Sequence, residues 1–158
     1  MKTDTLHILI VEDNPDAVEL LEEAFLEIAE KRFSQSWWRP CRRDHTAKVG
    51  EALALLRCQT FDAILLDLAV PGTREASAFD ILHDEAPLTP VIILASPGDE
   101  ALAFAAIRRG AHDFVSLQDL DTIPLARSIR AAVERGAWWS ASHLYAGIPA
   151  PARKYPAS

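Results

Sequence analysis

The stretch Ile8-Leu9-Ile10-Val11-Glu12-Asp13 is an apolar run that ends in two acids. A second run, Ala63-Ile64-Leu65-Leu66, ends in the same way at Asp67. Such a run is typical of a buried strand whose carboxyl end reaches water. Adjacent parallel strands end at one rim of a sheet, so we expect these three acids to lie together. Their charges repel one another unless a cation lies between them, and oxygen ligands suit Mg²⁺. The sequence therefore predicts a Mg²⁺ site around one reactive aspartate.

Short apolar runs alternate with amphipathic stretches five times along the chain. This alternation predicts an α/β fold, in which a doubly wound, five-stranded parallel sheet is covered by helices on both faces. The expected strands are His7 to Val11, Trp37 to Arg43, Asp62 to Asp67, Pro90 to Ala95 and Asp113 to Leu117. The expected helices are one opened by Asn14-Pro15-Asp16, and Thr46 to Arg57, Glu75 to Glu85, Asp99 to Arg109 and Asp121 to Arg135.

Proline and glycine indicate where several elements end. Pro40 interrupts the second expected strand, which favours an edge strand or a bulge. Gly110 suits a left-handed position after the fourth helix, and Gly136 is expected to stop the last one. We therefore expect one domain over residues 1–136 and a tail over 137–158, with no separate output domain. Trp138 and Trp139 in that tail could pack on the protein's own surface or form a dimer or partner contact.

Length and composition exclude several classes of protein. The 158 residues fit one domain with a short extension. The net charge of −7 argues against a mainly electrostatic nucleic-acid binder. Cys41 and Cys58 have no metal-ligand spacing and fit a reducing compartment. No apolar run approaches the ~20 residues of a membrane helix. We expect a cytoplasmic protein that does not bind a membrane.

Three segments together resemble the receiver domains of response regulators in two-component signalling. They are Ile8 to Pro15, Phe61 to Asp67 followed by Pro71-Gly72, and Ala106 to Phe114. The resemblance runs from about Leu6 to about Gly136, and it implies the flavodoxin-like (βα)5 receiver fold. The order and spacing of the segments carry the resemblance, since no single one of them is decisive.

The resemblance also implies a mechanism. A histidine kinase, a phosphotransfer protein or a small phosphodonor would give a phosphoryl group to Asp67. Mg²⁺ would be held by Asp67, Asp13 and the backbone carbonyl of Ala69, with Glu12 completing the outer acidic pair. Metal would neutralise charge on the moving oxygens. The output would be contact with a downstream protein, and the protein could form a homodimer.

Two positions depart from the pattern of the family. The Thr or Ser that hydrogen-bonds the phosphoryl group is replaced by Ala95, and the Lys at the end of the fifth strand is replaced by Leu117. Ser96 lies one residue late and could still turn toward the site. Phe114 stands where the family often has a switching aromatic, but it lacks a hydroxyl. Arg74 could take the place of the missing Lys.

Alternative interpretations remain open. The acids could instead cap helices, with Asp13 or Asn14 opening the first one. The protein could be a phosphoacceptor, favoured by its intact acids, or a pseudo-receiver that phosphorylation does not switch, favoured by Ala95 and Leu117. We do not expect an enzyme. A widespread class of aspartyl phosphatases has a second Asp where Ala69 stands, and no glycine-rich phosphate loop follows the first strand.

Overall fold

The computed structural model describes residues 5–31 and 38–146. One parallel sheet forms its centre, with the strand order β2-β1-β3-β4-β5. This confirms the predicted α/β architecture. The strands are β1 (Leu6–Val11), β2 (Cys41–Thr46), β3 (Ala63–Asp67), β4 (Val91–Ala95) and β5 (Asp113–Ser116). Every residue of β3 and β4 is buried, as continuous apolar runs covered on both faces require.

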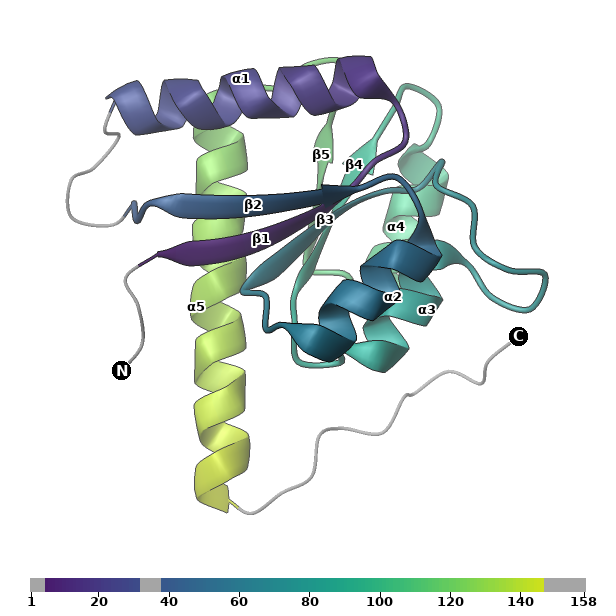
Figure 1. Ribbon diagram of the computed structural model, residues 1–158, viewed down its shortest axis with the longest axis vertical. Coiled ribbons are helices and arrows are strands. Elements are labelled where there is room, and N and C mark those ends of the chain that lie inside the picture. Colours follow the sequence, from purple (N-terminus) through teal and green to yellow (C-terminus); the bar gives the residue numbers. More distant parts are fainter. Residues whose placement is uncertain (1–4, 32–37, 147–158) are drawn as a thin grey trace.

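Helices cover both faces of the sheet (Figure 1). One apolar core lies between the sheet and two helices, α1 (Pro15–Lys31) and α5 (Thr122–Ala146). The other lies between the sheet and α2 (Val49–Cys58), α3 (Ala78–Glu85) and α4 (Glu100–Arg108). Alternate residues of β1 enter the two cores: Ile8 and Ile10 enter the first, and Leu9 and Val11 enter the second. None of the described helices is long and apolar enough to cross a bilayer.

Local chemistry explains where several helices begin and end. Helix α1 begins at Pro15, and the side chain of Asn14 accepts a hydrogen bond from the Asp16 N–H at 3.0 Å. The Ser77 hydroxyl accepts from the Asp80 N–H and caps α3. Gly110 follows α4 with φ of 120°, which confirms its predicted left-handed position.

The second strand was predicted too early in the chain. It begins at Cys41 rather than at Trp37, which lies outside the described residues. Pro40 precedes β2 instead of interrupting it, and its carbonyl accepts a hydrogen bond from the Leu6 N–H at 2.8 Å. The predicted edge position is confirmed, because β2 pairs only with β1 in the described sheet. An edge strand tolerates the charged sequence of β2 because it is only partly covered.

The last helix was predicted too short. Gly136 does not stop α5, which continues to Ala146 and extends beyond the sheet in Figure 1. At Gly136 the helix passes close to the chain that precedes β4. A Cβ atom there would lie 3.3 Å from Cδ of Pro90 and 3.7 Å from the carbonyl oxygen of Leu88. The lack of a side chain at Gly136 therefore lets α5 and the segment before β4 approach closely, and this explains a glycine inside the helix.

Candidate functional site

The carboxyl ends of β1 and β3 bring three acids together. The carboxylate oxygens of Glu12, Asp13 and Asp67 lie within 4.8 Å of one another. Glu12 follows β1 and is fully buried, Asp67 ends β3 and is 4% exposed, and Asp13 is exposed. The pairing of β1 with β3 produces this arrangement, because Val11 lies opposite Leu66 in the parallel register. The acids predicted to meet at one rim of the sheet do so.

Backbone N–H groups orient two of these acids. The Ala69 N–H donates to Oδ1 of Asp67 at 2.8 Å, and the Asn14 N–H donates to Oε1 of Glu12 at 3.0 Å. Asn14 also supplies the side-chain cap of α1. Helix capping therefore accounts for Asn14, but it does not account for the cluster of Glu12, Asp13 and Asp67.

The three acids concentrate negative charge at the site, and the hydrogen bonds that they accept compensate it only in part. Oε2 of Glu12 is buried and has no hydrogen-bond partner among the described residues. Burial, followed by the interaction with Asp67, raises the pKa of Glu12 to about 8. A divalent cation would give this oxygen a partner and relieve the repulsion, and a set of carboxylate oxygens suits Mg²⁺. The residues present thus fit the metal that the sequence predicts.

The neighbouring strand ends carry apolar side chains. Ala95 ends β4 and is 3% exposed, and Leu117 follows β5 and packs against the core beneath α1 and α5. Ser96 is half-buried. The ring of Phe114 packs edge-on against Phe104 of α4, with 5.2 Å between their centroids. Apolar side chains thus stand at Ala95 and Leu117, the positions for which the sequence resemblance predicts Thr or Ser and Lys.

Two residues of β2 also contribute to the site, although their pattern in the sequence does not indicate it. Nε2 of His45 donates to the backbone carbonyl of Glu12 at 2.8 Å, and the Glu12 N–H donates to the carbonyl of Thr46 at 3.0 Å. These contacts fix the peptide groups on both sides of the Glu12 Cα. The predicted bounds of the second strand exclude both residues, because they place His45 in the following loop and Thr46 in the following helix.

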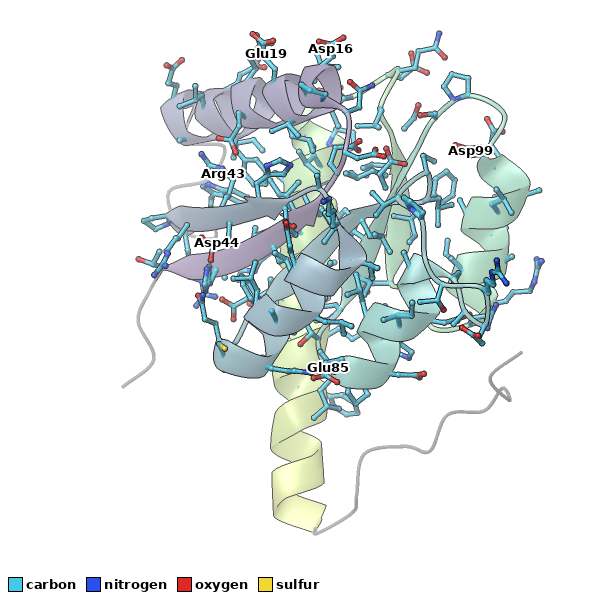
Figure 2. All side chains as sticks on the ribbon, turned by 45° about the vertical axis from the view of Figure 1, so that its right-hand side comes forward. Asp16, Glu19, Arg43, Asp44, Glu85 and Asp99 are labelled. Atoms are coloured by element: carbon cyan, nitrogen blue, oxygen red, sulfur yellow. The ribbon has the colours of Figure 1, made fainter. Side chains whose placement is uncertain are left out.

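Further charged side chains lie on α1, on β2 and in the loop that follows β3. Figure 2 shows Asp16 and Glu19 on the outer side of α1, pointing away from the sheet. Arg43 lies between β2 and α1 in the same view, where its guanidinium pairs with Glu22. Arg74, the candidate replacement for the missing Lys, is exposed in the loop that follows β3.

Comparison with known proteins identifies the same architecture. A family model described as "Response regulator receiver domain" matches residues 8–121. The chain is 33% identical over 110 residues to the glycerol metabolism activator of Pseudomonas putida, a match that covers 69% of this chain and 46% of the relative. It is 30% identical over 137 residues to the nitrogen assimilation regulatory protein NtrX of Azorhizobium caulinodans, covering 78% and 28%. The chain thus spans less than half the length of these curated relatives.

A solved structure shares the fold. It is the receiver domain of a sensor histidine kinase from Pseudomonas aeruginosa PAO1, described with a magnesium ion coordinated in the active site cleft. The TM-score is 0.63 at 21% identity, and the match covers 82% of this chain and 98% of the other.

Proposed function

The chain belongs to the response regulator receiver-domain family, and on that premise we propose that it accepts a phosphoryl group on Asp67 with the help of Mg²⁺ and signals by contact with another protein. Phosphorylation and Mg²⁺ binding are typical of this family, whose members interact with histidine kinases or phosphotransfer proteins. The proposal includes the cytoplasmic location expected from the sequence. It treats residues 1–136 as the signalling unit and the rest of α5 as an extension of it.

The observation that carries this proposal is the cluster of Glu12, Asp13 and Asp67 around a buried oxygen that has no hydrogen-bond partner among the described residues. We assign Asp67, Asp13 and the backbone carbonyl of Ala69 as metal ligands, with Glu12 as the buried member of the acidic pair. When bound, Mg²⁺ would neutralise charge on the phosphoryl oxygens. Glu12 and Asp13 would hold the cation, because they concentrate negative charge at the strand ends.

Asp67 is the proposed nucleophile. The Ala69 N–H fixes the orientation of its carboxylate. One carboxylate oxygen would attack phosphorus, and the bond from phosphorus to the donor atom would break. The electron pair would leave with that donor atom: a histidine nitrogen of a kinase or phosphotransfer protein, or the oxygen of an acyl phosphate. The phosphoryl group passes from donor to aspartate without any oxidant or reductant.

A second candidate function rests on Ala95 and Leu117. Without the hydroxyl and ammonium groups of the family at these positions, the phosphoryl oxygens would lose two polar partners. A pseudo-receiver would keep the fold and the acidic site, and it would bind its partner whatever the state of Asp67. We favour the phosphoacceptor, because a cluster of three carboxylates, two of them buried, is costly to retain without a ligand.

The test is the intact mass of the protein after incubation with Mg²⁺ and a small acyl phosphate. We expect a phosphoryl adduct on the native protein and on Asp119→Asn, a control that removes an exposed acid. Asp67→Asn should form none. Calorimetric titration with Mg²⁺ alone runs in parallel. Absence of an adduct on a native protein that binds Mg²⁺ would contradict the phosphoacceptor and support the pseudo-receiver.

A further inference from the structure

The hydrogen-bond ladder between β1 and β2 ends beside the acidic cluster. The parallel register runs up to Val11 opposite Thr46, and one more bond follows, from the Glu12 N–H to the Thr46 carbonyl at 3.0 Å. In a parallel ladder the next donor to the Glu12 carbonyl is the N–H of Lys48. That group instead donates to the Thr46 hydroxyl at 3.3 Å, as the chain turns toward α2. The Glu12 carbonyl therefore lacks the backbone donor that a continued ladder would provide.

The imidazole of His45 takes the place of this donor. Its Nε2 donates to the Glu12 carbonyl at 2.8 Å. Side chains alternate along a strand, so His45 lies on the same face of β2 as Cys41 and Arg43, which pack toward α1. The segment that joins β1 to α1 leaves the sheet on this face, beside the end of β2 (Figure 1). A side chain of the edge strand thus completes the ladder that its backbone does not.

The bond from His45 fixes the peptide group that joins Glu12 to Asp13, two acids of the cluster. On the other side of that peptide, the Asn14 N–H donates to Oε1 of Glu12 at 3.0 Å. Rotation of the peptide would turn the carboxylate of Asp13 relative to those of Glu12 and Asp67. The side chain of His45 is therefore placed to control how the oxygens of the cluster converge.

We propose that His45 is a positioning residue that determines the affinity and the selectivity of the metal site by fixing this peptide. Its role rests on the metal site proposed above and extends that site to β2. Mg²⁺ requires near-ideal octahedral geometry, whereas Ca²⁺ accepts irregular arrangements of oxygen ligands. Release of the peptide should therefore weaken Mg²⁺ binding more than Ca²⁺ binding. Loss of a positive charge on the ring would instead strengthen the binding of both ions.

Calorimetric titration of the full chain with Mg²⁺ and with Ca²⁺ tests this role. We expect His45→Ala to raise the Kd for Mg²⁺ roughly tenfold and the Kd for Ca²⁺ by no more than about threefold. His45→Gln keeps an N–H donor and should return the Kd for Mg²⁺ to within about threefold of the native value. His7→Ala is the matched control and should change neither Kd. Nε2 of His7 also bonds across the two strands, to Asp44 at 2.9 Å, but it does so near their amino ends.

Hydrogen exchange in the metal-free protein provides a measurement that does not depend on a bound ion. The Asn14 amide should exchange about tenfold faster in His45→Ala and at the native rate in His7→Ala. A Kd for Mg²⁺ that is unchanged in His45→Ala, or that rises by the same factor as the Kd for Ca²⁺, would overturn the positioning role and leave the metal site intact. A native protein that binds neither ion would overturn the proposed metal site and the role of His45 with it.

Discussion

Leu117 and Ala95 are joined directly by their backbones, since the Leu117 N–H donates to the Ala95 carbonyl at 2.9 Å. The two positions that depart from the receiver pattern are therefore neighbours on adjacent strand ends. One side chain is a methyl group, and the other is packed into the core beneath α1 and α5. Phosphoryl oxygens on Asp67 would meet neither a hydroxyl nor an ammonium group from these positions. The phosphorylated state of this protein should accordingly be less stable than that of a receiver with both groups.

Restoring the missing groups should stabilise the phosphorylated state. We predict that Ala95→Thr/Leu117→Lys raises the ratio of phosphorylated to free protein at a fixed acyl phosphate concentration by at least about tenfold, because a hydrogen bond to a charged group contributes ~1.5–3 kcal/mol. Intact mass measured at steady state reports this ratio. The long stem of Lys can keep part of the packing of Leu117.

A matched variant isolates the effect of charge in that experiment. Leu117→Met, compared with the single variant Leu117→Lys, places an apolar side chain that is unbranched like that of Lys at the same position and should leave the ratio unchanged. If the Lys and Met variants gave the same adduct population, the missing ammonium group would not explain the properties of this site.

Glu12 should make the stability of the metal-free protein depend on pH. Its pKa is raised to about 8 in the folded protein, from 4.5 in the ordinary case, so the folded state binds the proton more tightly than the unfolded state. This contribution is fully present below pH 4.5 and is lost as the pH rises through about 8. We predict that the free energy of unfolding in the presence of a chelator falls over this range. Glu12→Gln should be more stable than the native protein at pH 9, by up to a few kcal/mol.

Urea unfolding at pH 5.5 and pH 9 provides the measurement. Addition of Mg²⁺ at pH 9 should stabilise the native protein, and it should stabilise Glu12→Gln much less. Glu100→Gln, at the exposed start of α4, serves as the control. An equal pH dependence in the native and Glu12→Gln proteins would rule out Glu12 as its source.

The sequence was sufficient to predict the three acids because two strong signals agree. Apolar runs such as the one before Asp67 are long enough to identify buried strands, and a parallel sheet brings their ends to one rim. What it could not predict is β2. That strand, Cys41–Thr46, is defined by its pairing with β1 rather than by its own hydrophobicity. The hydrogen bond from His45 to Glu12 depends on that register and was missed for the same reason.

The length of α5 was mispredicted for a different physical reason. Glycine after an amphipathic stretch is a common helix stop, but Gly136 is a helical residue that lies against Pro90. Only the tertiary structure distinguishes a glycine that ends a helix from one that lets another segment come close. The same error placed Trp138 in a tail, whereas the residue belongs to α5 and is exposed there.

Arg43 should contribute more to stability than an ordinary surface arginine. Its guanidinium makes two close contacts with Glu22, at 2.7 Å from Nη2 and 3.0 Å from Nε, and lies 4.7 Å from the ring centroid of Phe25. These contacts attach the edge strand β2 to α1. We predict that Arg43→Ala lowers the free energy of unfolding by about 1–3 kcal/mol.

Arg57 offers a matched comparison for Arg43, measured by chemical denaturation in the same buffer. It also pairs with a glutamate, Glu85, at 2.7 Å, but its side chain is 63% exposed. Arg57→Ala should therefore change stability by no more than about 0.5 kcal/mol. Equal losses in both variants would show that the stacking on Phe25 and the partial burial of Arg43 add nothing.

Two glycines with positive φ should respond differently to a methyl group. Gly110 has φ of 120° and Gly98 has φ of 92°, so alanine is strained at both. A Cβ on Gly98 would meet nothing within 4 Å, whereas a Cβ on Gly110 would lie 3.0 Å from Nε2 of His83. We predict that Gly98→Ala costs about 1 kcal/mol and that Gly110→Ala costs more, because the His83 ring must move from its stacked position on Phe79. Thermal unfolding of the two variants measures the difference. A larger loss in Gly98→Ala would show that backbone strain, not contact with His83, determines the effect at these positions.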